Sequence, residues 1–153
     1  MKVEEFIEEQ FRERYKHFTI YGPSLRGKTK LAKYIADIFD GIYIDILKEF
    51  DGKKNEIDLF GPSKLIDFIN HFNSDNRKLM VIDQMDFLIS TWDDNQFREF
   101  LVFIDQNQSE ACYMFIMHNY RILEREDLIK KNDRGHSRLI NIYNIQQGGT
   151  ADG

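Results

Sequence analysis

The sequence of 153 residues has little cysteine, no long apolar run and no excess of positive charge. Its one cysteine, Cys112, cannot form an internal disulfide, and with four scattered histidines it offers no zinc-ligand spacing. No run of about 18 apolar residues is present, and the N-terminal segment carries charges where a signal peptide has an apolar core. The formal net charge of −5 is the opposite of what a dedicated nucleic-acid-binding protein shows. We therefore expect a cytoplasmic protein with no membrane partner.

What the sequence does contain is the composition of one compact domain. Apolar residues make up 42% of the chain and charged residues 31%, as in globular proteins. A chain of this length buries enough surface to fold without a disulfide or a structural metal. No repeat, linker or low-complexity block divides it. We expect a single core domain over residues 1–146 and a flexible tail over 147–153.

The apolar periodicity alternates between that of strands and that of helices. It predicts strands over 17–21, 41–46, 78–83, 112–117 and 139–145, and helices over 3–15, 28–39, 63–72 and 122–131, with one more helix opening at Asp94 or Asn95. Ser63 is the expected N-cap of the third of these helices, and the polar segment 48–58 is expected to be an exposed loop. Strand–helix alternation implies right-handed crossovers. The expected fold is therefore α/β, a three-layer sandwich around a five-stranded parallel sheet.

A glycine-rich segment between the first predicted strand and the helix at 28–39 matches the phosphate-binding pattern GxxxxGKT. It comprises Gly22, Pro23, Ser24, Leu25, Arg26, Gly27, Lys28 and Thr29, and Lys30 follows in the same expected nucleotide-binding segment. Glycines let the backbone bend so that N–H groups at a helix N-terminus point at phosphates. Lys28 would place a cation on the β and γ phosphates, and the Thr29 hydroxyl would bind Mg²⁺.

The second part that this chemistry needs is an acid at the end of another core strand. Asp83 ends the apolar run at 79–82, where it would reach Mg²⁺ through a water molecule. An apolar run ending in Asp is weak evidence alone, but its position in the third strand, after the phosphate-binding loop, makes it specific. We expect Thr29 and Asp83 to form the metal site.

These motifs, in this order, resemble the additional-strand class of P-loop ATPases, which includes the AAA+ proteins. The resemblance covers about residues 15–146 by order of elements. It implies ATP and Mg²⁺ as ligands, ATP hydrolysis, and a homo-oligomer with nucleotide at the subunit interface. No NKxD motif is present, which favours ATP over GTP.

The residue after Asp83 departs from the family pattern, because the family usually has Glu there and this chain has Gln84. A Gln can orient water but cannot accept its proton, so slow or absent hydrolysis is an open alternative. Asp86 matches a second acid in some family members and is a candidate substitute, or a helix-capping carboxylate. Asn119, with His118 as the alternative, ends the fourth strand where the family places a sensor of the γ-phosphate.

Basic residues gather between positions 121 and 138, where most are expected on a solvated face. The resemblance implies that Arg134 or Arg138, just before the fifth strand, is an arginine finger that reaches a neighbouring subunit's nucleotide. The same cluster is the candidate surface for DNA, should DNA be bound.

The chain has no segment that corresponds to the helical lid of most AAA+ proteins, so adenine contacts are expected near 15–17 or from another subunit. In outline it is similar to the small BrxF-type ATPases of BREX phage-defence systems. The expected function is an ATP-hydrolysing motor or switch subunit of a larger complex. A nucleotide-gated adaptor that recruits a larger partner or DNA is the alternative. A small-molecule kinase is disfavoured because no inserted lid is visible.

Overall fold

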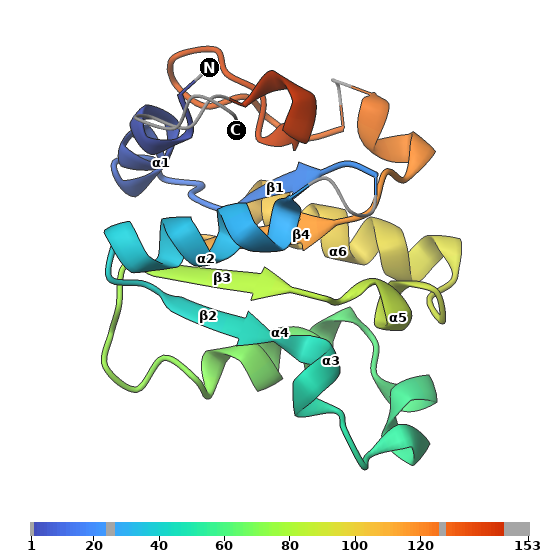
Figure 1. Cartoon of the computed structure of the whole chain (residues 1–153). Coiled ribbons are helices and arrows are strands. Elements are labelled where there is room, and N and C mark those ends of the chain that lie inside the picture. Colours follow the sequence, from blue (N-terminus) through green and yellow to red (C-terminus); the bar gives the residue numbers. More distant parts are fainter. Residues whose placement is uncertain (1, 24–26, 126–127, 146–153) are drawn as a thin grey trace.

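The computed structural model of the chain describes residues 2–23, 27–125 and 128–145. At its centre is a parallel sheet in the order β2-β3-β4-β1-β5 (Figure 1). The strands are β1 (Phe18–Tyr21), β2 (Ile42–Asp45), β3 (Leu79–Asp83), β4 (Cys112–Met117) and β5 (Leu139–Asn141). All neighbouring strands pair in parallel, which confirms the predicted five-stranded sheet.

Helices cover both faces of this sheet. Figure 1 shows α2 (Lys28–Ile38) in front of the strands and α4 (Pro62–Asn70) and α6 (Asp94–Gln106) behind them. The short α1 (Val3–Phe11) packs on the same face as α2, because its buried residues join the same apolar cluster. The chain is therefore the predicted three-layer α/β sandwich.

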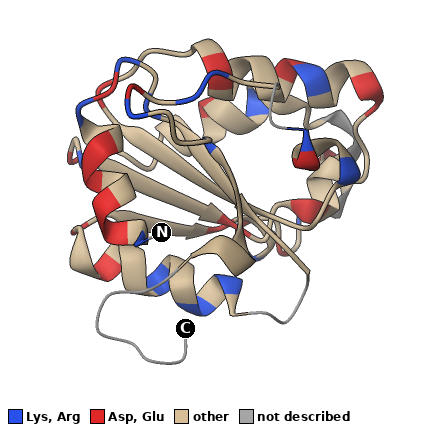
Figure 2. Cartoon of the chain, turned by 90° about the horizontal axis from the view of Figure 1, so that it is seen from above, with Lys and Arg blue, Asp and Glu red and all other residues tan. Residues whose placement is uncertain are grey.

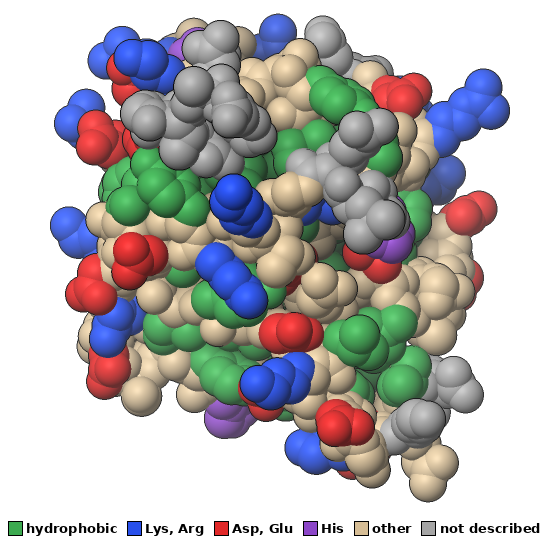
Figure 3. Space-filling model, viewed as in Figure 1, with side chains coloured by type: hydrophobic (Ala, Val, Ile, Leu, Met, Phe, Trp, Pro, Cys, Tyr) green, Lys and Arg blue, Asp and Glu red, His purple; other side chains and the backbone are tan. Residues whose placement is uncertain are grey.

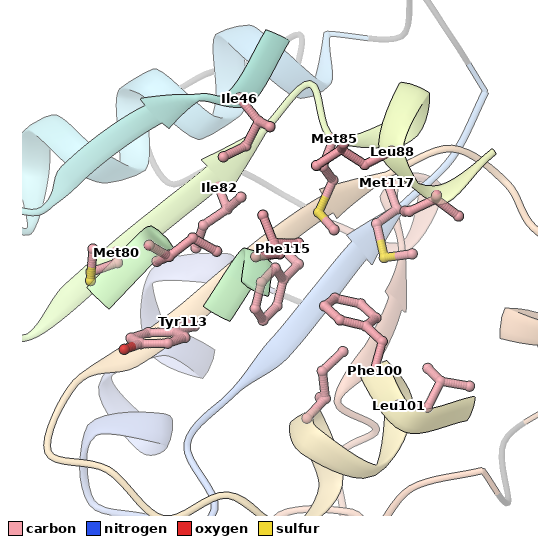
Figure 4. Packing of buried hydrophobic residues seen from close by; sticks show 14 of the residues in the cluster. Ile46, Met80, Ile82, Met85, Leu88, Phe100, Leu101, Tyr113, Phe115 and Met117 are labelled. Atoms are coloured by element: carbon pink, nitrogen blue, oxygen red, sulfur yellow. The ribbon is translucent and has the colours of Figure 1, made fainter. Parts of the chain in front are cut away.

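Alternate residues of β4 belong to two separate hydrophobic cores, one on each face of the sheet. Met114 and Ile116 point to the α1–α2 side, whereas Phe115 and Met117 point to the α4–α6 side, where Phe100 packs edge-on against Phe115 (Figure 4). All six residues of β4 are buried. Such a strand lacks polar alternation because both of its faces are covered.

Most of the described side chains of the segment 48–58 are exposed, as expected, but the segment is not a plain loop. It includes the end of α3 (Ile46–Glu49) and most of the 3₁₀ helix η1 (Lys54–Leu59), and between them Phe50 is only 4% exposed. The Phe50 ring makes edge contacts with Phe60 and Phe87. One aromatic residue in a polar segment thus ties that segment to the core, which a count of apolar residues does not reveal.

The helix predicted over 122–131 is also wrong for the described residues. Only the 3₁₀ helix η2 (Arg121–Glu124) forms there, and Leu123 and Ile129 are buried as separate anchors of an irregular segment. The fifth strand is shorter than predicted, because η3 (Ile142–Asn144) follows β5.

The bounds of α1 and α4 differ from the predicted ones by smaller amounts, whereas the start of α6 agrees. Helix α1 ends at Phe11 instead of residue 15. Helix α4 begins at Pro62, one residue before Ser63, and Gly61 is its N-cap. Proline is tolerated in the first turn because the backbone N–H that it lacks would have no partner within the helix. The Ser63 hydroxyl donates to Glu99 instead of capping. Helix α6 begins at Asp94 as predicted, held by a capping box between Asp93 and Gln96.

The order of strands brings distant polar residues to one edge of the sheet. Because β4 lies between β1 and β3, the ends of β1, β4 and β3 are consecutive neighbours, and β2 adds Asp45 opposite Asp83. Both β2 and β3 end in an acidic residue, and Figure 2, seen from above, shows acidic positions at the ends of strands. We call this side the carboxyl edge and the opposite side the amino edge. Within the described ranges, no helix combines the length and apolar character needed to cross a membrane.

Candidate phosphate and metal site

The site begins where β1 leads into α2 at the carboxyl edge. Gly27, the N-cap of α2, has a φ of 77°, a left-handed conformation that favours glycine. The first turn of α2 carries no acidic residue and no side chain caps it, in contrast to the acidic first turns of α1 and α6. Its unsatisfied N–H groups and the helix dipole therefore favour an anion. Ser24, Leu25 and Arg26 lie outside the described residues.

Lys28 is the buried cation of this site, with 8% of its surface exposed. Its Nζ donates to the carbonyl oxygens of Gly22, at 2.8 Å, and Pro23, at 2.5 Å. Burial lowers the pKa of Lys28, and the carboxylates of Asp86 and Asp83 oppose this shift. The ammonium is thus bonded to the first two residues of the segment that matches the phosphate-binding pattern.

Asp83 accepts hydrogen bonds from three donors at the end of β3. The hydroxyls of Thr29 and Tyr43 both donate to its Oδ2 at 2.7 Å, and the backbone N–H of Gln84 donates to its Oδ1 at 2.8 Å. The two residues predicted to form the metal site are therefore in direct contact, although they lie 54 positions apart.

Mg²⁺ fits this donor set. It prefers octahedral oxygen ligands and usually takes one or two from protein, leaving the rest to phosphate and water. Thr29 supplies a hydroxyl and Asp83 a carboxylate. In the described part of the chain, no three His, Cys, Asp or Glu side chains converge as a metal cluster of their own.

Gln84 holds a rare backbone conformation, with a φ of 60°. Left-handed geometry at a non-glycine residue costs free energy and often marks a functional site. The side chain is exposed and its Nε2 donates to Thr29 Oγ1 at 3.1 Å. The Gln84 amide is therefore turned toward the Thr29 side of the site.

Asp86, at the start of α5 (Asp86–Ile89), joins the ends of β3 and β4. Its Oδ1 accepts from the backbone N–H of His118 at 2.9 Å and from the Tyr120 hydroxyl at 2.8 Å. Its Oδ2 lies 3.3 Å from His118 Nε2. Burial and the Asp86 carboxylate raise the pKa of Tyr120, so Tyr120 remains a hydroxyl donor.

These groups surround one hollow of about 300 Å³. Its lining residues are Gly27, Lys28, Thr29, Lys30, Asp83, Gln84, Asp86 and His118. Every one of them was a candidate from the sequence. Asn119, the preferred sensor candidate, is exposed and is not among the described lining residues, whereas the alternative, His118, is.

The candidate arginine finger Arg138 is a buried residue of the amino edge. Only 1% of its surface is exposed. Nε donates to Lys130 O at 2.8 Å, and Nη1 donates to His17 O at 3.0 Å and Ile104 O at 2.8 Å. Nη2 donates to the backbone oxygen and the carboxylate of Asp105. A guanidinium held by three segments of its own chain does not reach a neighbouring subunit, so Arg138 is not an arginine finger.

The expectation of adenine contacts near 15–17 is wrong for His17. His17 is fully buried, stacked on Phe103 and Tyr113, and it precedes β1 at the amino edge. Its Nδ1 accepts from the Tyr113 N–H, and its Nε2 bonds Asn107 Oδ1 at 2.8 Å. Burial lowers its pKa to about 4, and the ring is a neutral part of the core.

Arg134 differs from Arg138 because it is exposed. It lies in a turn in which Asn132 Oδ1 accepts from the N–H groups of Arg134 and His136, each at 3.0 Å. Asn132 is itself buried and donates to Gln10 of α1 at 3.0 Å. A fixed turn therefore carries Arg134 on the surface.

Sequence analysis missed Tyr43 and Tyr120. Tyr43 lies in β2 in the register that places Asp45 opposite Asp83, so its side chain shares a face with Asp83. The only sequence signal was a tyrosine two residues before the end of a strand, and it becomes informative once β2 is known to neighbour β3. Tyr120, two residues after His118, carried no signal.

No family model matches the chain, and no curated protein matches it. The class that the structure itself defines is an α/β protein with a five-stranded parallel sheet, compatible with a P-loop NTPase.

Proposed function

We propose that this protein binds Mg-ATP at the carboxyl edge and hydrolyses it. The observation that carries the proposal is the contact between Thr29 Oγ1 and Asp83 Oδ2 at 2.7 Å, beside the uncapped N-terminus of α2. Lys28 would exchange its two carbonyl partners for the β and γ phosphates, and Thr29 and Asp83 would part to hold Mg²⁺. The N–H groups of α2 would bind phosphate oxygens.

Isothermal titration with Mg-ATP tests this proposal. Lys28→Ala should weaken binding about 100-fold or more, because it removes charge-assisted hydrogen bonds to phosphate. Lys64→Ala, an exposed lysine of α4 on the opposite face, is the matched control and should bind as the wild type does. No heat of binding in the wild type would overturn the proposal.

We further propose that the protein self-assembles with nucleotide between subunits, and that Arg134 acts in trans. Its support is the exposed guanidinium on a fixed turn, next to the buried and unusable Arg138. ATP should increase the assembly size in light scattering, and Arg134→Ala should lower turnover without changing nucleotide affinity. An assembly size that ignores ATP would count against this role.

A nucleotide-gated adaptor with little hydrolysis is the second candidate. Gln84 favours it, because an amide in the place of the family's Glu cannot accept a proton and here bonds to Thr29. Steady-state phosphate release from the wild type beside Gln84→Glu separates the two candidates. Turnover that Glu raises strongly from near zero supports the adaptor, and wild-type turnover that Glu does not raise supports the ATPase.

We propose that the protein acts as a motor or switch subunit of a larger complex, with phage defence as the proposed process. DNA is a weaker candidate partner. Figure 3 shows basic and acidic side chains intermixed over the face that carries α2, without a large area of one sign. A gel shift that weakens steeply with salt would establish DNA binding.

A further inference from the structure

Gln84 is an exposed residue between two buried ones at the end of β3. Its neighbours in the chain are Asp83, which is 3% exposed, and Met85, which is fully buried. The backbone passes between them with a φ of 60° at Gln84, a conformation that costs free energy in a residue other than glycine. Such a conformation persists only where surrounding contacts hold it. The contacts of Gln84 therefore show which groups this conformation brings together.

Gln84 contacts both residues of the expected metal site, one with its backbone and the other with its side chain. Its N–H donates to Asp83 Oδ1 at 2.8 Å, and its Nε2 donates to Thr29 Oγ1 at 3.1 Å. The first contact is local, but the second joins residues 55 positions apart. The strained conformation thus places one residue on both of the groups that Mg²⁺ is expected to use.

The hydrogens around the Thr29 hydroxyl have one consistent arrangement. A hydroxyl has a single hydrogen to donate, and Thr29 donates it to Asp83 Oδ2 at 2.7 Å. Thr29 Oγ1 can therefore only accept from Gln84, whose Nε2 is a donor. The Thr29 oxygen, which is expected to bind Mg²⁺ directly, thus faces the hydrogen of an amide.

Resting on the proposed binding of Mg-ATP, we propose that Gln84 is a positioning residue that holds Thr29 in its metal-free arrangement and competes with Mg²⁺ for the Thr29 oxygen. A cation needs a lone pair of that oxygen, and a partly positive amide hydrogen beside it opposes the cation. The amide must leave Thr29 before the hydroxyl binds the metal. Because the Gln84 side chain is exposed, it can leave without moving the buried residues on either side. The contact therefore sets how much Mg²⁺ the site requires.

Tyr43 also bonds to the metal site but differs from Gln84 in what it occupies. Its hydroxyl donates to Asp83 Oδ2 at 2.7 Å, and burial raises the pKa of Tyr43, so the phenol remains a donor. Asp83 is expected to reach Mg²⁺ through water, so a donor there orients the carboxylate and leaves the direct ligand accessible. Loss of the Tyr43 hydroxyl should raise the Mg²⁺ requirement, whereas loss of the Gln84 amide should lower it.

The Mg²⁺ requirement of ATP binding tests the proposal. In Gln84→Met the side chain keeps its length but has no N–H, so the Mg²⁺ concentration for half-maximal ATP binding should fall about fivefold, the equivalent of one neutral hydrogen bond. Gln84→Gly also lacks the amide and adopts the left-handed conformation without strain, so it should show the same fall even if Gln84→Met folds poorly. Gln106→Met, at the exposed C-terminal end of α6, is the matched control and should keep the wild-type requirement.

The direction of the change separates this role from a structural one. A substitution that merely damages the site raises the Mg²⁺ requirement, whereas loss of a competing donor lowers it. An unchanged or higher requirement in both Gln84→Met and Gln84→Gly would overturn the proposal. Failure of the wild type to bind Mg-ATP would instead overturn the proposed function.

Nitrogen NMR of side-chain amides gives a readout that needs no nucleotide. The Gln84 signal is assigned from its absence in Gln84→Met. In the wild type this amide should be as ordered as the backbone around it, and Thr29→Val, which removes the acceptor and keeps the shape of the side chain, should make it mobile. A wild-type Gln84 amide as mobile as that of exposed Gln106 would overturn the proposal, whether or not Mg-ATP binds.

Discussion

Both edges of the sheet carry buried polar side chains, but the surroundings of these side chains differ between the two edges. At the amino edge, Arg138, His17 and Asn132 are buried. Their hydrogen-bond partners are backbone and side-chain groups of the protein itself, from segments far apart in the sequence. At the carboxyl edge, Lys28 and Asp83 are also buried, yet they line a hollow together with exposed Gln84 and His118.

This difference separates polar groups that hold the fold from those available to a ligand. A buried polar network with every donor matched stabilises one conformation and leaves nothing for a partner to bind. The Thr29 hydroxyl donates to Asp83, and the Lys28 ammonium donates to the carbonyl oxygen of Gly22. A bound cation and phosphate can replace these contacts. Substitutions at the amino edge should thus cost stability, and those at the carboxyl edge should cost binding.

The largest expected effect is that of Arg138→Met on folding. The variant removes the Arg138 donors from four backbone oxygens at the amino edge and leaves the Asp105 carboxylate with Lys130 as its remaining partner, which should lower the free energy of unfolding by about 3–5 kcal/mol. Urea denaturation measures the change. Arg134→Met, an exposed arginine nearby, should change stability by no more than about 0.5 kcal/mol. Equal stability of the two variants would contradict a structural role for Arg138.

The second effect is a loss of stability in acid caused by His17. Its pKa is about 4 in the folded chain, against 6.5 for an unperturbed histidine, so the unfolded chain binds the proton first as the pH falls. The stabilisation is complete above pH 6.5 and declines between pH 6.5 and pH 4, by about 3 kcal/mol.

The unfolding free energy of His17→Gln, measured by urea across this pH range, should lack that part of the slope. His71→Gln should keep it, because His71 is exposed. A slope that survives in His17→Gln would show that other groups cause the acid sensitivity.

The smallest effect is that of Tyr43→Phe, at the carboxyl edge. The change removes one hydroxyl donor from Asp83 Oδ2, a hydrogen bond worth about 1 kcal/mol. We expect the Mg²⁺ concentration for half-maximal ATP binding to rise about fivefold, and the free energy of unfolding to fall by no more than about 1 kcal/mol. Tyr143→Phe, whose ring is 64% exposed, should change neither. A loss of stability without a change in Mg²⁺ dependence would place Tyr43 with the amino-edge residues.

The carboxyl edge was more predictable from the sequence than the amino edge. The phosphate-binding loop and Asp83 lie in short local patterns, and β3 and β4 are apolar throughout because both faces are covered. These signals need no knowledge of which strands are neighbours.

The amino edge depends on contacts that no local pattern contains. Arg138 has the composition of a surface residue, and its partners come from positions 17, 104, 105 and 130, so its burial follows only from the assembled fold. Leu123 and Ile129 lie within the helix predicted over 122–131 but are buried as two separate anchors, and η2 is the only helical element described there. Tyr43 escaped for a related reason, since its hydroxyl matters only once β2 is known to pair with β3.

The most direct test of the contrast between the edges is urea denaturation with and without Mg-ATP. At a ligand concentration about 100 times the dissociation constant, binding to the folded chain alone should raise the free energy of unfolding by about 2.7 kcal/mol. Lys28→Ala should unfold near the wild-type midpoint without ligand and should lose this increment, whereas Lys64→Ala should retain it. A wild-type midpoint that millimolar Mg-ATP leaves unchanged would contradict the assignment of the carboxyl edge as a nucleotide site.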